Sequence, residues 1–233
     1  MSFVKALSYD SISPVTGTRD EEREYPSADG RPFAETDFHR HEMTYLIEAL
    51  QRFYRHDQNV YVSGNLLLYY IEGDRKAAVA PDVFVVQGVE KRSRRCFLLW
   101  KEGRSPSLVI EVTSESTRDE DQGKKSLYQS LGIEEYFLHD LLSEYLNPPL
   151  QGFRLQGGCY RRIAPERDGT LVSRTTGLGL RRQGDRLHLI DLDTGESLRS
   201  LQDYQEEEAR LAEALRTAEE ELARLRREID SRR

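Results

Sequence analysis

The sequence predicts an α/β fold, in which helices flank a mixed β-sheet and β hairpins and a long helix follow toward the C-terminus. Three observations support this. Two short, almost continuously apolar runs, 79–86 and 108–112, are typical of strands buried on both faces. A strand, a polar turn, a helix and a strand follow one another over 108–139, which indicates a crossover between parallel strands. Beyond residue 200, leucines recur at alternating helical spacings.

Composition indicates one globular domain with an appendage. The chain has 233 residues, of which 37% are hydrophobic and 32% charged, so it can bury a core. A net charge of -7 argues against coating nucleic acid by bulk electrostatics, which needs many Lys and Arg contacts to phosphates. The sequence does not exclude a local basic groove formed by residues 91–95 or by Arg161 and Arg162. The alternative is that these residues are charge runs exposed to solvent.

Cysteine content and hydropathy indicate the compartment. Cys96 and Cys159 are far apart and form no CxxC pattern, so the sequence predicts neither a disulfide framework nor a zinc site. The N-terminal residues lack a long apolar segment, and nowhere do about 18 apolar residues run together. We therefore expect a cytoplasmic protein that makes no use of a membrane.

The first third of the chain is expected to begin with an arm and a helix. Residues 1–34 mix Ser, Pro, Gly and charge, which is typical of an irregular, partly disordered arm. A helix is predicted over 36–54, with Thr36 or Asp37 as its N-cap. Its apolar residues repeat at helical spacing, so one face should pack on the sheet.

Two polar residues at the start of this helix have two interpretations. His39 shares the inward stripe with Met43 and Leu46, and Glu35 directly precedes the helix. They are either a capping-region acid and a histidine at the edge of the core, or both lie at the mouth of a site formed by Asp82 and its neighbours.

A hairpin is expected next. A long strand over 60–71 should pair with 79–86, because a Gly-Asp turn lies at 73–74. Asp82 then lies in or at the start of the second strand. Pro81 cannot donate a ladder hydrogen bond, so it marks a strand beginning, a bulge or an unpaired position.

The following residues are expected to complete the sheet. A polar turn at 113–117 offers several helix caps, and the next helix should stop at Gly132. The strand over 135–140 should lie parallel to 108–112. A basic, partly apolar connection that carries Trp100 is expected over 87–106. From Gly152, hairpins should extend the sheet or cap one side, with short β segments at 153–155, 159–160, 171–172 and 187–190.

The chain is expected to divide into the arm, a main domain over 35–198 and a helical tail over 199–233. The tail carries a narrow seam of a and d positions, formed by Leu211, Leu215, Ala218, Leu222, Leu225 and Ile229. A narrow seam favours association with another copy of the chain, so we expect a homo-oligomer, with a dimer as its form. The alternative is a single surface helix folded on the domain.

Asp82 and Glu111 are the candidate metal ligands, since each interrupts an apolar strand. A buried carboxylate without a partner costs several kcal/mol, so it acquires a raised pKa, an Arg or Lys partner, or a metal ion. Two such acids in neighbouring strands indicate one shared cation. Mg²⁺, or Mn²⁺ in its place, needs only one or two protein carboxylates.

Lys124 is the candidate catalytic lysine. The helix over 120–131 presents one stripe to the sheet, formed by Lys124, Leu127, Tyr128 and Leu131. Lys125 should instead turn toward Asp121 and solvent, because a helix turns by about 100° per residue. Two carboxylates and an ammonium group at one sheet edge suit metal-dependent phosphodiester hydrolysis. The alternative is that the Lys124 stem covers apolar surface while its ammonium group reaches solvent.

This set of residues resembles the Uma-type (Uma-two) family of endonucleases, within the PD-(D/E)XK restriction-endonuclease-like superfamily. The resemblance runs from about Glu35 to the C-terminal β region and rests on Pro81-Asp82, Glu111 to Thr117, Lys124, Tyr128, residues 132–136 and Asp140.

The resemblance implies a restriction-endonuclease-like fold that acts on nucleic acid, expected to be DNA. It also implies that Asp82 and Glu111 are metal-binding acids and that Glu35 or His39 is a polar residue of the first helix. We further expect Asp121, Lys125 and Tyr128 to support the site. In the standard motif a lysine follows the second acid by two positions. Here that residue is Thr113, and the resemblance implies that Lys124 replaces the lysine.

The sequence leaves three functions open. The first is a Mg²⁺-dependent nuclease in which Asp82 and Glu111 hold one or two ions and Lys124 assists the attacking water. The second is a catalytically weak nuclease-fold scaffold that binds nucleic acid or protein through its tail, which the net acidity and the displaced lysine favour. In the third, both acids are structural and each is paired with an arginine.

Overall fold

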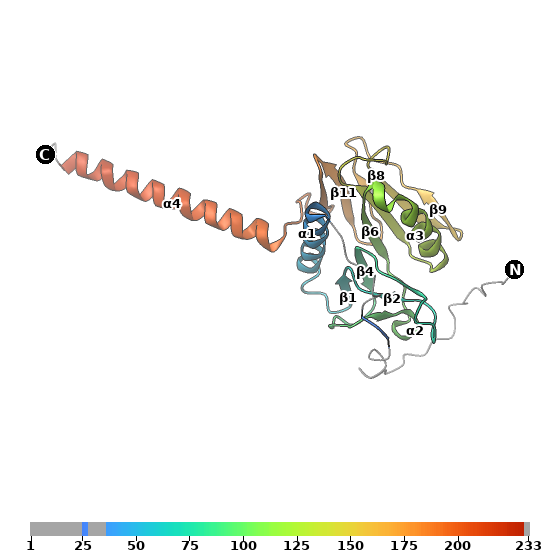
Figure 1. Cartoon of the computed structure of the whole chain (residues 1–233). Coiled ribbons are helices and arrows are strands. Elements are labelled where there is room, and N and C mark those ends of the chain that lie inside the picture. Colours follow the sequence, from blue (N-terminus) through green and yellow to red (C-terminus); the bar gives the residue numbers. More distant parts are fainter. Residues whose placement is uncertain (1–24, 28–35, 231–233) are drawn as a thin grey trace.

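The computed structural model describes residues 25–27 and 36–230. The expected arm over 1–34, apart from 25–27, and Glu35 lie outside the described residues. A six-stranded mixed sheet forms the centre (Figure 1), as predicted, with the pair β6–β7 parallel and its other pairs antiparallel. In spatial order its strands are β1 (Val60–Ser63), β4 (Val83–Gln87), β6 (Leu108–Thr113), β7 (Glu135–Asp140), β8 (Leu150–Gln156) and β9 (Cys159–Arg162).

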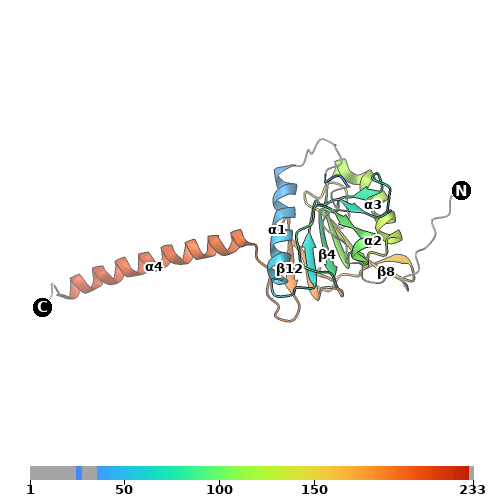
Figure 2. The ribbon, with the colours of Figure 1, turned by 90° about the horizontal axis from the view of Figure 1, so that it is seen from below.

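Two helices cover opposite faces of this sheet (Figure 2). Helix α1 (Asp37–Phe53) packs with Val83 and Val85, whereas Tyr128 of α3 (Arg118–Ser130) belongs to the core cluster of Phe84 and Val86. Alternate residues of a strand point to opposite faces, so β4 serves both cores. This explains why the central strands are apolar throughout.

The helix boundaries follow local sequence signals. Thr36 is the N-cap of α1, and its hydroxyl accepts a hydrogen bond from the backbone N–H of His39 at 3.2 Å. A short 3₁₀ helix, η2 (Glu115–Thr117), leads into α3. Gly132 follows α3 with φ 72°, a left-handed conformation that glycine adopts at low cost. The predicted start of α1 and the predicted stop at Gly132 are confirmed, whereas α3 begins two residues before the predicted range of 120–131.

The prediction of one long strand over 60–71 is wrong. β1 ends at Ser63, and the chain continues into a second sheet of β3 (Ala78–Val79), β2 (Leu68–Tyr69) and β5 (Phe97–Leu98). Gly64 lies at the break, and only glycine fits there, because a Cβ at this position would lie 2.0 Å from the carbonyl oxygen of Asp82. Asn65, with φ 49°, then donates from its N–H to the Pro81 carbonyl at 2.8 Å.

The expected antiparallel pairing is present but divided into two ladders. β1 pairs with β4, and β2 pairs with β3. The second arm, predicted as one strand over 79–86, is likewise broken, and Asp82 lies in the break directly before β4. Because of this break, Asp82 lies at the N-terminal end of β4.

The connection over 87–106 contains β5 and the short helix α2 (Leu99–Glu102). Arg94 stacks over the Tyr61 ring at 4.2 Å, and its Nε lies 2.7 Å from a carboxylate oxygen of Glu102. Arg92 contacts the same carboxylate at 2.9 Å. The basic run at 91–95 is therefore committed in part to internal ion pairs.

The C-terminal strands play both of the predicted roles. β8 and β9 form a hairpin that extends the main sheet, and a separate sheet consists of β10 (Leu171–Val172), β11 (Leu178–Gln183) and β12 (Arg186–Asp191). Leu180 and Leu187 of this sheet join the core beneath α1. β11 escaped prediction because it contains no β-branched residue and half of it is polar.

Helix α4 (Leu201–Asp230) extends away from the body of the protein (Figures 1 and 2). Its seam residues Leu211, Leu215 and Leu222 are 59%, 62% and 53% exposed. The predicted tail helix is confirmed, and the alternative in which it folds back on the domain is wrong. Within the described ranges no helix combines the length and the apolar character needed to cross a membrane.

Candidate active site

An open cleft of about 1000 Å³ lies where β6 ends, between the start of α3, the start of α1 and the β2–β3 turn. It brings together most of the predicted site residues, since its lining includes Asp82, Glu111, Lys124, His39 and Asp121. These residues come from four separate parts of the chain. The fold therefore assembles the constellation that the sequence predicted.

Asp82 is held by donors on both sides. Its Oδ2 accepts a hydrogen bond from the backbone N–H of Val112 at 2.8 Å and one from His39 Nε2 at 3.1 Å. Burial opposes ionisation of this carboxyl, but the His39 hydrogen bond, the Lys124 charge and the Val112 N–H together hold its pKa below the ordinary value. Asp82 is therefore a carboxylate at neutral pH.

Glu111 lies on β6 and is only 1% exposed. Lys124 Nζ donates to its Oε2 at 2.8 Å, and the Tyr128 hydroxyl donates to its Oε1 at 2.6 Å. Burial raises the pKa of Glu111 to about 8, Lys124 opposes that rise, and the neighbouring Asp82 charge adds to it. The two acids thus repel each other, and a nearby cation would favour the charged form of both.

The structure directs the two adjacent lysines to different places, as the helix phase predicted. Lys124 enters the cleft, and although burial lowers its pKa, the charges of Glu111 and Asp82 outweigh burial and raise it. Lys125 Nζ lies 3.5 Å from the centre of the Phe153 ring, outside the cleft lining. The expectation that Lys125 turns toward Asp121 is wrong, because Asp121 is 5% exposed and lines the cleft.

Thr113, at the position of the lysine in the standard motif, belongs to a network of hydroxyl groups. Asp121 Oδ2 accepts hydrogen bonds from the hydroxyls of Thr113, of Thr117 at 3.3 Å and of Tyr145 at 2.6 Å. The network fastens the first turn of α3 to β6. Lys124, one turn further along α3, is thereby positioned against Glu111.

Two groups at the site, Tyr145 and the Val112 carbonyl, could not be predicted from the sequence. Tyr145 lies in the loop after β7, which folds because Asp140 accepts hydrogen bonds from the backbone N–H groups of Glu144 at 3.0 Å and Tyr145 at 2.8 Å. The Val112 carbonyl lies 2.8 Å from His39 Nε2. Such loop and backbone contacts depend on the tertiary fold, and neither produces a periodic pattern.

His39 occupies the mouth of the site, which was one of its two predicted interpretations. Its Nε2 faces two acceptors, the Asp82 carboxylate and the Val112 carbonyl, so this nitrogen carries the proton. Oxygen atoms of Asp82, Glu111 and Val112 are of the type that Mg²⁺ prefers. No group of three or more His, Cys, Asp or Glu side chains in the described ranges is arranged as a metal site. Mg²⁺ needs only one or two carboxylates, so the residues present fit it.

Glu135 is a buried acid outside the cleft whose hydrogen-bond donors give it a structural role. Arg154 Nε, the Ser173 hydroxyl and the Thr175 hydroxyl donate to its carboxylate at 2.7, 2.5 and 2.9 Å. Burial raises its pKa, but these donors outweigh burial and lower it. The partners found for Asp82 and Glu111 are His39 and Lys124, so the structure does not support the arginine-paired alternative for the cleft acids.

The chain matches one family model and is similar to a solved structure. The family model Uma2, described as "Putative restriction endonuclease", matches residues 11–194, which is well over half of the chain. A crystal structure described as "a putative nuclease belonging to DUF820 from Anabaena variabilis" is 14% identical, with 69% of this chain and 90% of that chain covered and a TM-score of 0.47. No curated protein matches the chain.

Proposed function

The chain belongs to the Uma2 family, and from this premise we propose that it is a Mg²⁺-dependent endonuclease that hydrolyses phosphodiester bonds of nucleic acid, with DNA as its substrate. The observation that carries the proposal is the buried Glu111 carboxylate, paired with Lys124 at 2.8 Å and coupled electrostatically to Asp82 in an open cleft. Residues 35–198 form the catalytic unit in this proposal.

Each residue of the cleft has a distinct role. Asp82 and Glu111 would hold the ion, which when bound supplies a water of lowered pKa and positive charge beside the phosphate. Lys124 is a permanent cation, so it can orient the attacking water or stabilise charge on the phosphoryl oxygens. Tyr128 and His39 fix the orientations of Glu111 and Asp82 through their hydrogen bonds.

The function is tested by incubating the wild-type protein with supercoiled plasmid, single-stranded DNA and single-stranded RNA. Each substrate is combined with Mg²⁺, Mn²⁺ or EDTA, and the products are separated by electrophoresis. We expect cleavage of DNA with either ion and none with EDTA. RNA cleavage alone would change the substrate, and intact substrates under every condition would contradict the proposal.

A second candidate function is a nuclease-fold scaffold with little catalysis, which binds a partner through its tail. The observation that favours it is that Thr113 is bound to Asp121 and Tyr145 where the standard motif has its lysine. The cleavage assay separates the two functions, because a scaffold leaves all substrates intact and still binds its partner.

We further propose that α4 pairs with α4 of a second copy. Isolated helices are marginal in water, and Leu211, Leu215 and Leu222 form an exposed narrow seam. With Leu215 and Leu222 at a positions, Glu221 is at g and Arg226 is at the e position five residues later. These opposite charges would attract across a parallel pair, which favours parallel pairing.

Deleting residues 203–233 should therefore reduce the solution mass to that of one core domain, as measured by light scattering. In the full chain, Leu215→Asp with Leu222→Asp should have the same effect, because charge at a positions opposes burial of the seam. Glu220→Gln, at the outer f position, is the matched control and should keep the wild-type mass. An unchanged oligomer in the deletion variant would place the interface elsewhere.

A further inference from the structure

The cleft continues beyond the acids to the turn between β2 and β3, where Arg75 and Lys76 form part of its lining. Both residues are exposed, and neither makes an ion pair with another residue of the described ranges. Lys124 is committed to Glu111, and His39 to Asp82. Among the described residues that line the cleft, Arg75 and Lys76 are therefore the cations that remain available to a ligand.

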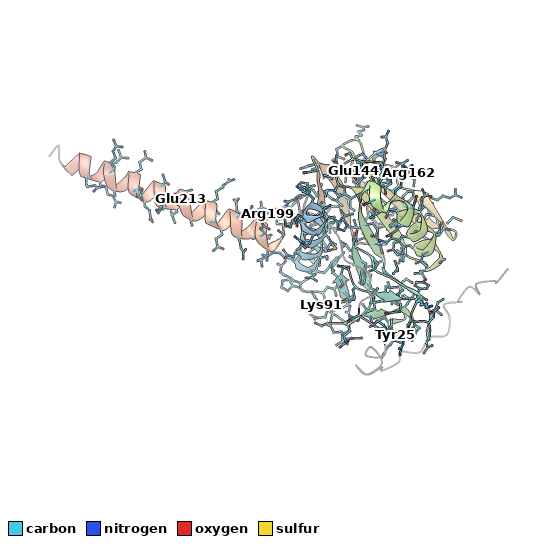
Figure 3. The ribbon with its side chains drawn as sticks, viewed as in Figure 1. Tyr25, Lys91, Glu144, Arg162, Arg199 and Glu213 are labelled. Carbon is cyan, nitrogen blue, oxygen red and sulfur yellow. The ribbon has the colours of Figure 1, made fainter. Side chains whose placement is uncertain are left out.

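The opposite wall carries the opposite charge. Glu115, Glu120 and Glu144 line the cleft at the start of α3 and in the loop after β7, and Glu144 accepts a hydrogen bond from the Glu115 backbone N–H at 2.8 Å. Figure 3 shows Glu144 and Tyr25 on different sides of the body, and the Tyr25 hydroxyl contacts Gly73 of the β2–β3 turn. A polyanion entering this cleft is repelled by these acids and attracted by the side chains of Arg75 and Lys76, which line the cleft where the neighbouring Glu72 and Asp74 do not.

The β2–β3 turn is well braced to hold such a ligand. The Tyr25 hydroxyl accepts a hydrogen bond from the Gly73 N–H at 2.9 Å, and Asp74 accepts one from the Lys76 N–H at 2.8 Å. These bonds fix the backbone from which the two side chains project. A turn with a fixed backbone loses less entropy when its side chains bind a ligand than a mobile turn does.

We propose that Arg75 and Lys76 bind the backbone phosphates of the nucleic-acid strand whose adjoining phosphodiester lies at Asp82 and Glu111. The inference rests on the proposed nuclease function and adds the path of the strand along the basic wall. Exposed charges are screened beyond about 10 Å at 0.1 M salt, so only phosphates next to the turn are affected. Such contacts position a strand without reading its sequence.

Other basic residues fit this role less well. Arg92 and Arg94 are paired with Glu102. Arg161 and Arg162 lie on β9 and do not line the cleft. Since both are exposed, the double variant Arg161→Ala with Arg162→Ala removes the same charge at a site outside the cleft, and it serves as the matched control.

The test measures binding of a fluorescent 20-nucleotide single-stranded DNA by anisotropy, at several salt concentrations and without a divalent ion so that no cleavage occurs. Each phosphate neutralised on a single strand contributes about −0.7 to the slope of log K against log salt. Arg75→Ala with Lys76→Ala should therefore flatten the slope by about 1.4 and weaken binding about tenfold at 0.15 M salt. The control should keep the wild-type slope.

The outcomes separate this inference from the proposed function. A wild-type slope in the Arg75 and Lys76 variant overturns the inference alone, as does an equal loss of slope in the control. If wild-type protein binds no DNA and cleaves none, both the inference and the proposed function fail. Thermal unfolding of both variants should match the wild type, since all four side chains are exposed.

Discussion

Lys124→Ala is expected to remove Mg²⁺-dependent cleavage, whereas Lys125→Ala should leave catalysis intact and at most weaken nucleic-acid binding. Lys124 Nζ lies 2.8 Å from Glu111 in the cleft, and Lys125 Nζ lies over the Phe153 ring outside it. Removing a donor that stabilises transition-state charge costs about 100- to 1000-fold in rate. Initial rates of plasmid nicking under identical conditions measure both variants.

Folding must be controlled, because Lys124→Ala leaves the buried Glu111 with Tyr128 as its remaining hydrogen-bond donor. Loss of one partner of a buried ion pair destabilises a protein by about 3–5 kcal/mol. Lys124→Met keeps most of the apolar stem and gives a second inactive variant. Circular dichroism should show both variants folded. Wild-type activity in Lys124→Ala together with loss in Lys125→Ala would mean that the wrong lysine has been assigned.

Asp82→Ala is expected to abolish Mn²⁺ binding, which calorimetric titration of the apo protein measures directly. Asp82 is ionised in the fold, so it supplies charge that attracts the ion at neutral pH. Changes to groups that only support a metal ligand reduce affinity by about 10- to 100-fold. Loss of a ligand itself should cost at least as much.

Asp82→Asn is the conservative companion, because an amide can still accept the hydrogen bond from Val112 N–H. It should fold normally and still lose Mn²⁺. Glu120→Gln, an exposed acid at the acidic wall, is the control and should bind like the wild type. Unchanged Mn²⁺ affinity in both Asp82 variants would place the ion elsewhere and remove the basis of the shared site.

Much of this site was predictable because its carriers are the most regular parts of the chain. β6 and the start of β4 are apolar runs, so Asp82 and Glu111 stood out as carboxylates without a packing role. The helical stripe of α3 gave the direction of Lys124 and of the buried Tyr128. The periodicity and composition of these segments were sufficient to predict the positions of Asp82, Glu111, Lys124 and Tyr128.

The remaining features depend on contacts between distant segments. The strand break lies at Gly64, where the Asp82 carbonyl leaves no room for a side chain, a contact that no local pattern encodes. Around the helix axis, Asp121 lies between Lys124 and Lys125. Periodicity alone therefore placed Asp121 beside Lys125 and solvent and not in the cleft. The hydroxyls of Thr113 and Tyr145 decide its position, and Tyr145 is in a loop shaped by Asp140.

The central claim is that Asp82 and Glu111 form the metal-dependent centre of a nuclease. The most direct measurement compares supercoiled plasmid cleavage by wild type and Glu111→Ala, purified in parallel, over a range of Mg²⁺ concentrations. Wild type should nick or linearise the plasmid as the Mg²⁺ concentration rises, while Glu111→Ala, shown to be folded by circular dichroism, should leave it supercoiled. Equal cleavage by the two proteins would mean that Glu111 has no part in the reaction and that the metal-dependent centre lies elsewhere.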